Sequence, residues 1–166
     1  GIGKAIAREL ALCGCTTVIT ARGSEALKAA SQEISAETRQ SVFGIVCDLT
    51  STTGVNQMVG SAAKEMGGRI DILVNNAAAP GGLARGTLAD IKDEDVINDL
   101  DTKVMGYLRC ARAVAPYMIA QNWGRIINIG GTSARRANGN LSAGVRNAGL
   151  VNFTKYLAED LGQSGI

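Results

Sequence analysis

Four short apolar runs alternate along this chain with longer segments of helical spacing, and this alternation limits the possible fold more than any other feature. The runs contain few polar residues, as expected for strands that are buried on both faces of a parallel sheet; they are residues 16–20, 41–46, 70–75 and 125–129. Between them, apolar residues recur every three or four positions, the period of helices that pack one face on a sheet. The pattern predicts an α/β fold, a Rossmann-like doubly wound parallel sheet in a single domain.

Length and composition restrict the class of protein further. With 166 residues, 46% of them hydrophobic and 19% charged, the chain can bury the core of one domain. The net charge of +2 is spread along the sequence, which excludes the concentrated basic surface of a nucleic-acid-binding protein. Because we see neither a membrane-spanning apolar run nor a signal peptide, we expect a cytoplasmic protein with no nucleic-acid and no membrane partner.

The cysteines and the absence of histidine bear on two further kinds of site. The four cysteines form no Cys-x-x-Cys pair and the chain has no histidine, so we expect no metal site. Reduced cysteines that pack as small apolar side chains are the expectation for a cytosolic protein. Without histidine, the Ser-His and Cys-His nucleophile arrangements are also excluded.

Both ends of the sequence look incomplete for this architecture. A helix is predicted to begin at Gly3 without a preceding strand, and the chain stops at Ile166, where another strand is expected. We therefore expect the inner part of a longer protein. A sheet without its central strand would leave backbone groups unpaired and would be marginally stable alone.

Five short motifs resemble, in the right order, those of the short-chain dehydrogenase/reductase family, and the resemblance covers essentially the whole chain. They are Gly1-Ile2-Gly3, Asp48-Leu49, Asn75-Asn76-Ala77-Ala78, residues 124–129 and residues 148–161. They are similar to the end of the glycine-rich cofactor loop, the adenine-contacting acidic position, the Asn-Asn-Ala-Gly motif, the strand before the catalytic Ser and the helix after the catalytic Lys. The resemblance implies a partial NAD(P)-binding domain over residues 1–166, without the family's first strand and C-terminal part.

The resemblance places a dinucleotide on three of these motifs. Gly1-Ile2-Gly3 opens a helix whose N-terminal backbone attracts phosphate, with a plain glycine turn as the alternative. Asp48-Leu49 is expected at the adenine, while the Asp48 carboxylate is also a candidate cap of the next helix. Asn76-Ala77-Ala78 is expected near the adenosine ribose, with a strand-end turn as the alternative.

The end of the second strand of the family's fold decides which cofactor is expected. An acidic residue there binds the ribose 2′-hydroxyl of NAD. Here that position is Ala21 and Arg22 follows, and a guanidinium beside an uncharged neighbour suits the 2′-phosphate of NADP. We expect NADP, with NAD as the second option; a solvated surface arginine is the alternative reading of Arg22.

All four catalytic positions of the family are replaced. The alignment puts Lys103 at the Asn position, Gly131 at the Ser position, Ala143 at the Tyr position (Gly144 with a one-residue gap) and Asn147 at the Lys position. In the family, Tyr exchanges the proton, Lys lowers its pKa and holds the ribose, Ser orients the carbonyl and Asn holds a water relay. The family's activity therefore does not carry over through these residues.

The replacements at 103 and 147 suggest a substitute. Lys and Asn have exchanged places, and the two positions are near each other in the family. The exchange would keep one ammonium, on Lys103, beside the nicotinamide ribose and close to Asn147. A partly desolvated lysine can serve as an acid near neutral pH, whereas an exposed lysine on the outside of a helix is the alternative.

Other polar residues are secondary candidates. Thr132 and Ser133 would donate to a carbonyl oxygen in place of the lost Ser, and capping of a loop explains them equally well. Arg146 is a candidate for an acidic substrate group or the cofactor phosphates, although a solvent-facing helix arginine is favoured. The remaining tyrosines lie away from the motifs, two in packing positions and one on a helix surface: Tyr107, Tyr117 and Tyr156.

Two functional hypotheses follow. The first is an NADP-preferring oxidoreductase that moves hydride between the cofactor and a small-molecule carbonyl or alcohol, with Lys103, Thr132 and Ser133 at the substrate oxygen. The second is a catalytically inactive dinucleotide-binding regulatory or scaffold protein. The resemblance also implies a homodimer or homotetramer through two long helices, whose small residues permit close approach: Ala111, Ala113, Ala115 and Gly149.

Overall fold

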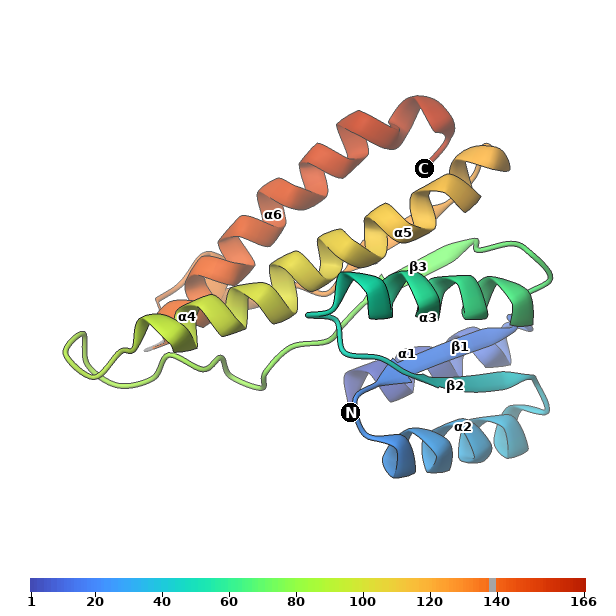
Figure 1. The fold of residues 1–166 in the computed structure, drawn as a ribbon, viewed down its shortest axis with the longest axis horizontal. Coiled ribbons are helices and arrows are strands. Elements are labelled where there is room, and N and C mark those ends of the chain that lie inside the picture. Colours follow the sequence, from blue (N-terminus) through green and yellow to red (C-terminus); the bar gives the residue numbers. More distant parts are fainter. Residues whose placement is uncertain (138–139) are drawn as a thin grey trace. The chain divides into compact units, whose positions relative to one another are not determined.

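The structure, a computed structural model, describes residues 1–137 and 140–166 of the chain. The chain forms two compact units, Gly1–Ile70 and Asp71–Ile166, each with its own pair of parallel strands. Figure 1 shows their helices and strands. Within the described residues, no helix combines the length and the apolar character that crossing a membrane requires.

The first unit begins with a helix and continues as strand–helix–strand–helix. In chain order the elements are α1 (Ile2–Leu12), β1 (Thr17–Ala21), α2 (Ser24–Thr38), β2 (Val42–Val46) and α3 (Thr52–Glu65). The parallel register pairs Thr17 with Val42 and Ala21 with Val46. Both strands begin one residue later than predicted from the sequence, and α1 begins one residue earlier.

Helices α1 and α2 pack on each other and against the strands. Ala7 and Ala11 of α1, Ile34 of α2 and Val42 of β2 form a buried cluster, against which Ile19 of β1 packs. The alanines let the backbone of α1 come close to its neighbours, and the larger apolar side chains fill the remaining space. The apolar side chains that recur periodically in the sequence thus form the core of this unit.

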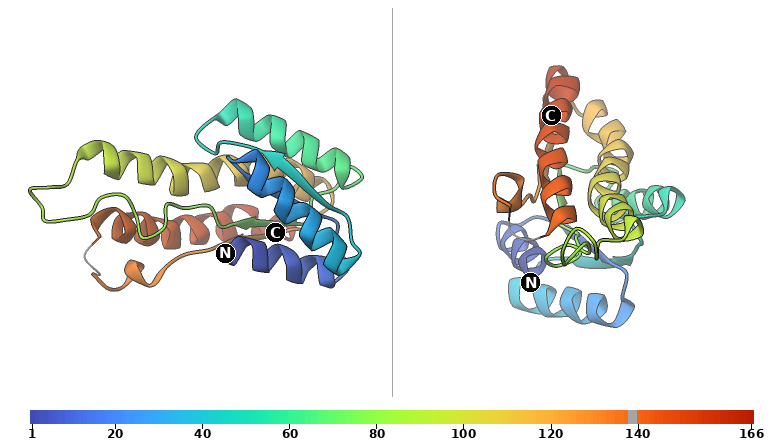
Figure 2. Two further views of the ribbon diagram at one scale, coloured as in Figure 1. Left: turned by 90° about the horizontal axis from the view of Figure 1, so that it is seen from below. Right: turned by 90° about the vertical axis from the view of Figure 1, so that its left-hand side faces the viewer.

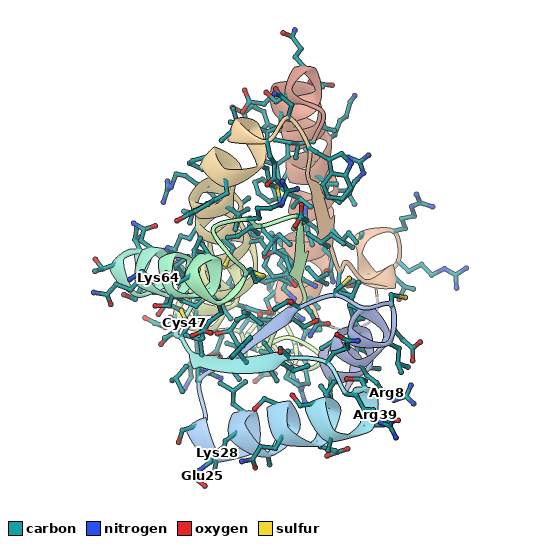
Figure 3. All side chains as sticks on the ribbon, turned by 90° about the vertical axis from the view of Figure 1, so that its right-hand side faces the viewer. Arg8, Glu25, Lys28, Arg39, Cys47 and Lys64 are labelled. Atoms are coloured by element: carbon teal, nitrogen blue, oxygen red, sulfur yellow. The ribbon has the colours of Figure 1, made fainter. Side chains whose placement is uncertain are left out.

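Ion pairs add a second connection between α1 and α2. Lys4 Nζ lies 2.5 Å from Glu33 Oε2, and Arg8 Nη2 lies 2.5 Å from Glu37 Oε1. Figure 3 labels Arg8 and also Arg39, the residue in left-handed conformation that ends α2. These side chains are exposed, so solvent screens both pairs and their contribution to stability is small.

The second unit contains the remaining strands and the longest helices. Its elements are β3 (Ile72–Asn75), α4 (Asp93–Leu100), the π-helix η1 (Asp101–Met105), α5 (Gly106–Ala120), β4 (Arg125–Asn128), η2 (Thr132–Ala134), α6 (Leu141–Leu161) and η3 (Gly162–Ser164). Strands β3 and β4 are parallel, with Ile72 opposite Arg125 and Asn75 opposite Asn128. Figure 2 shows α5 and α6 as the two long helices of this unit.

Elements α4, η1 and α5 form one continuous helix. The residues at its two internal junctions, Leu100, Asp101, Met105 and Gly106, all have right-handed helical backbone angles. In the π segment each hydrogen bond spans one residue more than in an α-helix, so the helix is locally wider and its side chains change direction. Such segments occur frequently at functional sites, and Lys103 lies in the middle of this one.

Candidate functional site

Lys103 points into the second unit and not into solvent. Its side chain is buried, with 4% of the residue exposed, and Nζ lies 5.9 Å from the centre of the Tyr107 ring. The alternative of an exposed lysine on the outside of a helix is therefore wrong. The π segment explains the inward direction, because it changes the rotation of the helix between Asp101 and Met105.

Lys103 and Asn147 are in direct contact, as the exchange of residue types suggested. Lys103 Nζ donates to Asn147 Oδ1 at 2.8 Å. Since an ammonium has donors only, this bond fixes the orientation of the amide, and Asn147 Nδ2 faces the other way. Among the described residues Asn147 is the hydrogen-bond partner of the Lys103 ammonium, whose other N–H groups remain for a ligand or water.

Ser133 holds the far side of the Asn147 amide. Asn147 Nδ2 donates to Ser133 Oγ at 2.7 Å and to the Ala143 carbonyl at 2.9 Å. The buried Ser133 hydroxyl in turn donates to the same carbonyl at 2.9 Å. Ser133 is therefore engaged with protein groups, whereas Thr132 beside it is exposed.

Gly131 makes this arrangement possible. A Cβ at Gly131 would lie 2.8 Å from Asn147 Nδ2, whereas a Cβ at Gly130 would meet open space. The backbone of Gly131 is extended, with φ −162°, so the reason for glycine here is space and not conformation. The loss of the family's Ser and the gain of Asn at 147 are thus physically linked.

The surroundings of Lys103 favour its neutral form. Burial lowers the pKa of Lys103 from 10.5 to about 8, with a further lowering by the Arg146 cation and an opposing effect of the Asp99 carboxylate. A group with a pKa close to the working pH can both donate and accept a proton. Burial raises the pKa of Tyr107, so its hydroxyl stays neutral and does not replace the family's Tyr.

Arg146 makes a buried ion pair, which corrects the sequence interpretation. The favoured reading was a solvent-facing arginine, but its guanidinium pairs with Asp99 of α4, and the side chains are 5% and 0% exposed. Arg146 Nη2 also donates to the Ala79 carbonyl at 3.0 Å. Because Asp99 already neutralises it, Arg146 is not placed to bind an acidic substrate group or cofactor phosphates.

Sequence reasoning missed Asp99 and Ser142, both fully buried. Ser142 Oγ accepts from the backbone N–H groups of Leu83 and Ala84 at 3.2 and 3.1 Å. A signal was present in the sequence, since Asp99 and Lys103 occupy the apolar stripe that continues to Tyr107 along the same helix. A charge in phase with buried positions indicates a buried polar partner.

In the first unit, Gly1-Ile2-Gly3 forms the start of α1. Gly1 is the N-cap, no side chain caps the helix there, and Gly1 and Ile2 are exposed. The first backbone N–H groups of a helix have no partner within it, and with the helix dipole they attract a phosphate. This motif therefore fits the pyrophosphate of a dinucleotide.

Arg22 and Asp48 follow the carboxyl ends of β1 and β2, which lie at the same edge because the strands are parallel. Both residues are exposed, and Leu49 is half-buried. Asp48 Oδ1 accepts from the backbone and hydroxyl of Thr50 at 3.0 and 2.9 Å. The cap of α3 is Ser51, which accepts from Gly54 N at 3.0 Å, so the cap reading of Asp48 is wrong.

Asn76-Ala77-Ala78 follows the carboxyl end of β3 in the second unit. Asn76 and Ala78 are half-buried and Ala77 is exposed. The buried Asn75 before them donates to Asn128 Oδ1 of β4 at 2.9 Å, which fixes the ends of the two parallel strands together. Ligands of open α/β sheets bind at this end of the strands.

The chemistry that the second unit offers is proton exchange and hydrogen bonding. Its titratable group beside the Asn147 amide is Lys103. Thr132, the neighbour of Ser133 in sequence, carries an exposed hydroxyl. No three Cys, Asp or Glu side chains are grouped to hold a metal ion in the described part of the chain.

Comparison with known proteins places this arrangement in a family. The short chain dehydrogenase model matches residues 1–166. A putative ketoacyl reductase of Streptomyces coelicolor is 35% identical over 171 residues, which is 100% of this chain and 63% of that protein. An actinorhodin polyketide ketoreductase variant solved with NADPH superimposes with a TM-score of 0.92 at 32% identity, covering 100% of this chain and 63% of that one.

A second solved structure, NAD⁺-bound xylitol dehydrogenase, has a TM-score of 0.90 at 30% identity and covers 99% of this chain and 62% of that chain. The fold is therefore Rossmann-like, as the alternation of strands and helices predicted. The chain belongs to the short chain dehydrogenase family, as the five motifs implied, and it spans about three fifths of the length of the relatives named here.

Proposed function

We propose that this chain is part of an NADP-preferring oxidoreductase that transfers hydride between the cofactor and a small-molecule carbonyl or alcohol. The observation that carries the proposal is the buried contact between Lys103 and Asn147, in which the two residue types of the family's catalytic set are present but exchanged. A lysine without a functional role is not expected at a buried position, because burying an ammonium costs free energy.

The cofactor residues of the proposal are those that the resemblance named. In the first unit, Gly1-Ile2-Gly3 offers backbone N–H groups without a side-chain cap for the pyrophosphate. We assign the exposed Arg22 to the 2′-phosphate and Asp48-Leu49 to the adenine. In the second unit, Asn76-Ala77-Ala78 follows β3. Relatives solved with NADPH and with NAD⁺ support a nicotinamide cofactor, and Arg22 favours NADP. When bound, the cofactor supplies the hydride.

The protein's own contribution is placed on Lys103. Its ammonium donates a hydrogen bond to the substrate oxygen and gives or takes the proton, because its pKa of about 8 suits exchange near neutral pH. Asn147 holds the ammonium, Ser133 holds the Asn147 amide, and the exposed Thr132 donates to the same substrate oxygen. The ketoacyl reductase relatives favour a carbonyl substrate.

A second candidate is a dinucleotide-binding regulatory or scaffold protein without catalysis. The positions of the family's Tyr and Ser are Ala143 and Gly131, and neither carries a group that exchanges a proton. The loss of these groups is the observation that favours this candidate. It predicts binding of NADPH without turnover.

The test is oxidation of NADPH and NADH by the complete protein over a broad panel of carbonyl compounds, together with binding of both cofactors by calorimetry. The oxidoreductase proposal expects turnover that Lys103→Ala abolishes while NADPH binding persists. Unchanged turnover in Lys103→Ala refutes the role of Lys103. Binding of NADPH without turnover of any compound favours the non-catalytic protein.

We also propose that the protein forms a homodimer or homotetramer through α5 and α6. The support is a set of exposed apolar side chains, one on α5 and four on α6: Ile119, Leu141, Val145, Val151 and Tyr156. Gly149 is exposed and open to close approach, whereas Ala111 is buried and packs within its own unit. Light scattering coupled to size-exclusion chromatography of the complete protein distinguishes these assemblies from a monomer.

A further inference from the structure

Two opposite charges are buried one helical turn from the Lys103–Asn147 contact, and the proposed chemistry does not use them. Asp99 precedes Lys103 by four residues on the continuous helix, and Arg146 precedes Asn147 by one residue on α6. Asp99 and Arg146 pair with each other, and the pair is almost completely shielded from solvent. Removing two charges from water costs desolvation free energy, so stability alone does not explain a buried ion pair at this position.

The pair also fastens the segment that follows β3. Asp99 Oδ2 accepts from the Leu83 backbone N–H at 3.2 Å, and Arg146 Nη2 donates to the Ala79 carbonyl at 3.0 Å. Ser142, one turn before Arg146 on α6, accepts from Leu83 N and Ala84 N. Helix α4, the segment 79–84 and the first turns of α6 are thus held together by buried hydrogen bonds, and Lys103 lies where these elements meet.

We propose that Asp99 and Arg146 are a positioning pair for Lys103: their hydrogen bonds fix its place against Asn147, and their balanced opposite charges fix the electrostatic environment of its ammonium. The inference rests on the proposed role of Lys103 as the proton-exchanging group. It adds two residues that touch neither substrate nor cofactor and act only through Lys103.

Among residues 1–137 and 140–166, three charged or titratable groups from the packed elements act on Lys103 or lie beside it. From α4 it faces Asp99, from α5 the ring of Tyr107, whose hydroxyl stays neutral, and from α6 Arg146. Asp101, in the same π segment as Lys103, pairs with Arg109: Asp101 Oδ1 lies 2.7 Å from Arg109 Nη2. Removal of one member of the Asp99–Arg146 pair therefore changes the field at Lys103 in a direction fixed by the sign of the charge removed.

The experiment is a pH titration of the Lys103 side-chain resonance by NMR in the complete protein with ¹³C,¹⁵N-labelled lysine, assigned with Lys103→Met. Arg146→Met removes a cation, so the midpoint of Lys103 should rise; Asp99→Asn removes an anion but keeps an acceptor for Leu83 N, so the midpoint should fall. Each shift should be on the order of one pH unit, as for a charge about 10 Å away in an effective dielectric of about 20. The double variant Asp99→Asn/Arg146→Met should return the midpoint towards that of the wild type.

Opposite shifts are the result that a purely structural pair would not give, since loosening of the site admits water and moves both midpoints upwards. Equal shifts in one direction, or none, overturn the proposal. Glu159→Gln, which removes the exposed partner of Lys155 at the other end of α6, is the matched control and should leave the midpoint unchanged. If Arg146→Met does not fold, Arg146→Lys keeps the charge and should leave the midpoint near the wild-type value, while Asp99→Asn still lowers it.

The titration does not depend on turnover, so the two proposals fail separately. Opposite shifts in a protein without turnover keep the effect of the Asp99–Arg146 pair on Lys103 and favour the non-catalytic candidate. Turnover without opposite shifts overturns the positioning pair and supports the oxidoreductase. Where turnover exists, the pH dependence of kcat/KM should shift in the same directions as the NMR midpoints, with kcat changed more than KM.

Discussion

Lys103→Met changes how the stability of this protein depends on pH. The folded protein lowers the pKa of Lys103 from 10.5 to about 8. Between these values the unfolded chain binds the proton and the folded chain does not, so the stability contributed by this group rises with pH. Below about pH 8 the buried ammonium destabilises the fold by roughly 3 kcal/mol, since one pKa unit is about 1.4 kcal/mol.

The variant removes this penalty and leaves Asn147 Oδ1 without its donor, which costs about 1–3 kcal/mol at every pH. The free energy of unfolding of the wild type minus that of the variant should therefore increase by about 2–3 kcal/mol between pH 7 and about pH 10. Denaturant unfolding of the complete protein in the presence of a reductant, followed by circular dichroism at several pH values, measures this difference. Contributions of all other titrating groups cancel between the two proteins.

The control is Lys155→Met on α6, whose side chain is 75% exposed, and for which the difference should not change with pH. A difference for Lys103→Met that is equally flat would refute the reasoning, because it would mean that Lys103 is as well solvated in the folded protein as in the unfolded chain. A difference that decreases with pH would mean that Asp99, and not burial, dominates at Lys103.

Three further predictions concern single residues. Gly131→Ser should destabilise the protein by about 1–3 kcal/mol, because its Cβ would lie 2.8 Å from Asn147 Nδ2. The control Gly130→Ser meets open space and should destabilise the protein far less. Thermal unfolding compares the two variants, and equal melting temperatures would contradict the packing argument. Arg22→Ala should weaken NADPH binding about tenfold and leave NADH binding unchanged, as measured by calorimetry, and an equal loss for both would mean that Arg22 does not contact the 2′-phosphate. Cys47, labelled in Figure 3, is buried, and its pKa is raised by burial and by Asp48. Iodoacetamide at pH 8 should therefore alkylate the exposed Cys13 first, as followed by mass spectrometry of the peptides. Faster reaction of Cys47 would contradict its burial.

The class of fold and the order of the elements could be predicted from the pattern of residues alone. Apolar periodicity is a local property, because a helix or strand must bury one face or both, and so the four strands were predicted to within two residues of their observed ends. The positions of Arg22 and Asp48 after strands were visible in the same way, because each follows an apolar run. Parallel strands bring their carboxyl ends to one edge. The exchange of Lys and Asn between 103 and 147 was also visible in the sequence, and the resemblance implied that the two positions lie near each other.

The sequence did not reveal which polar groups are buried or which groups they pair with. Arg146 in isolation reads as a surface arginine, and nothing in its neighbourhood in sequence reveals that Asp99, 47 residues away, neutralises it. The direction of Lys103 depends on a π segment, a change of one residue in the hydrogen-bond pattern that amino-acid composition does not encode. Burial of a charge is a property of the whole surrounding structure, because its cost and its pKa are set by groups that distant parts of the chain bring together.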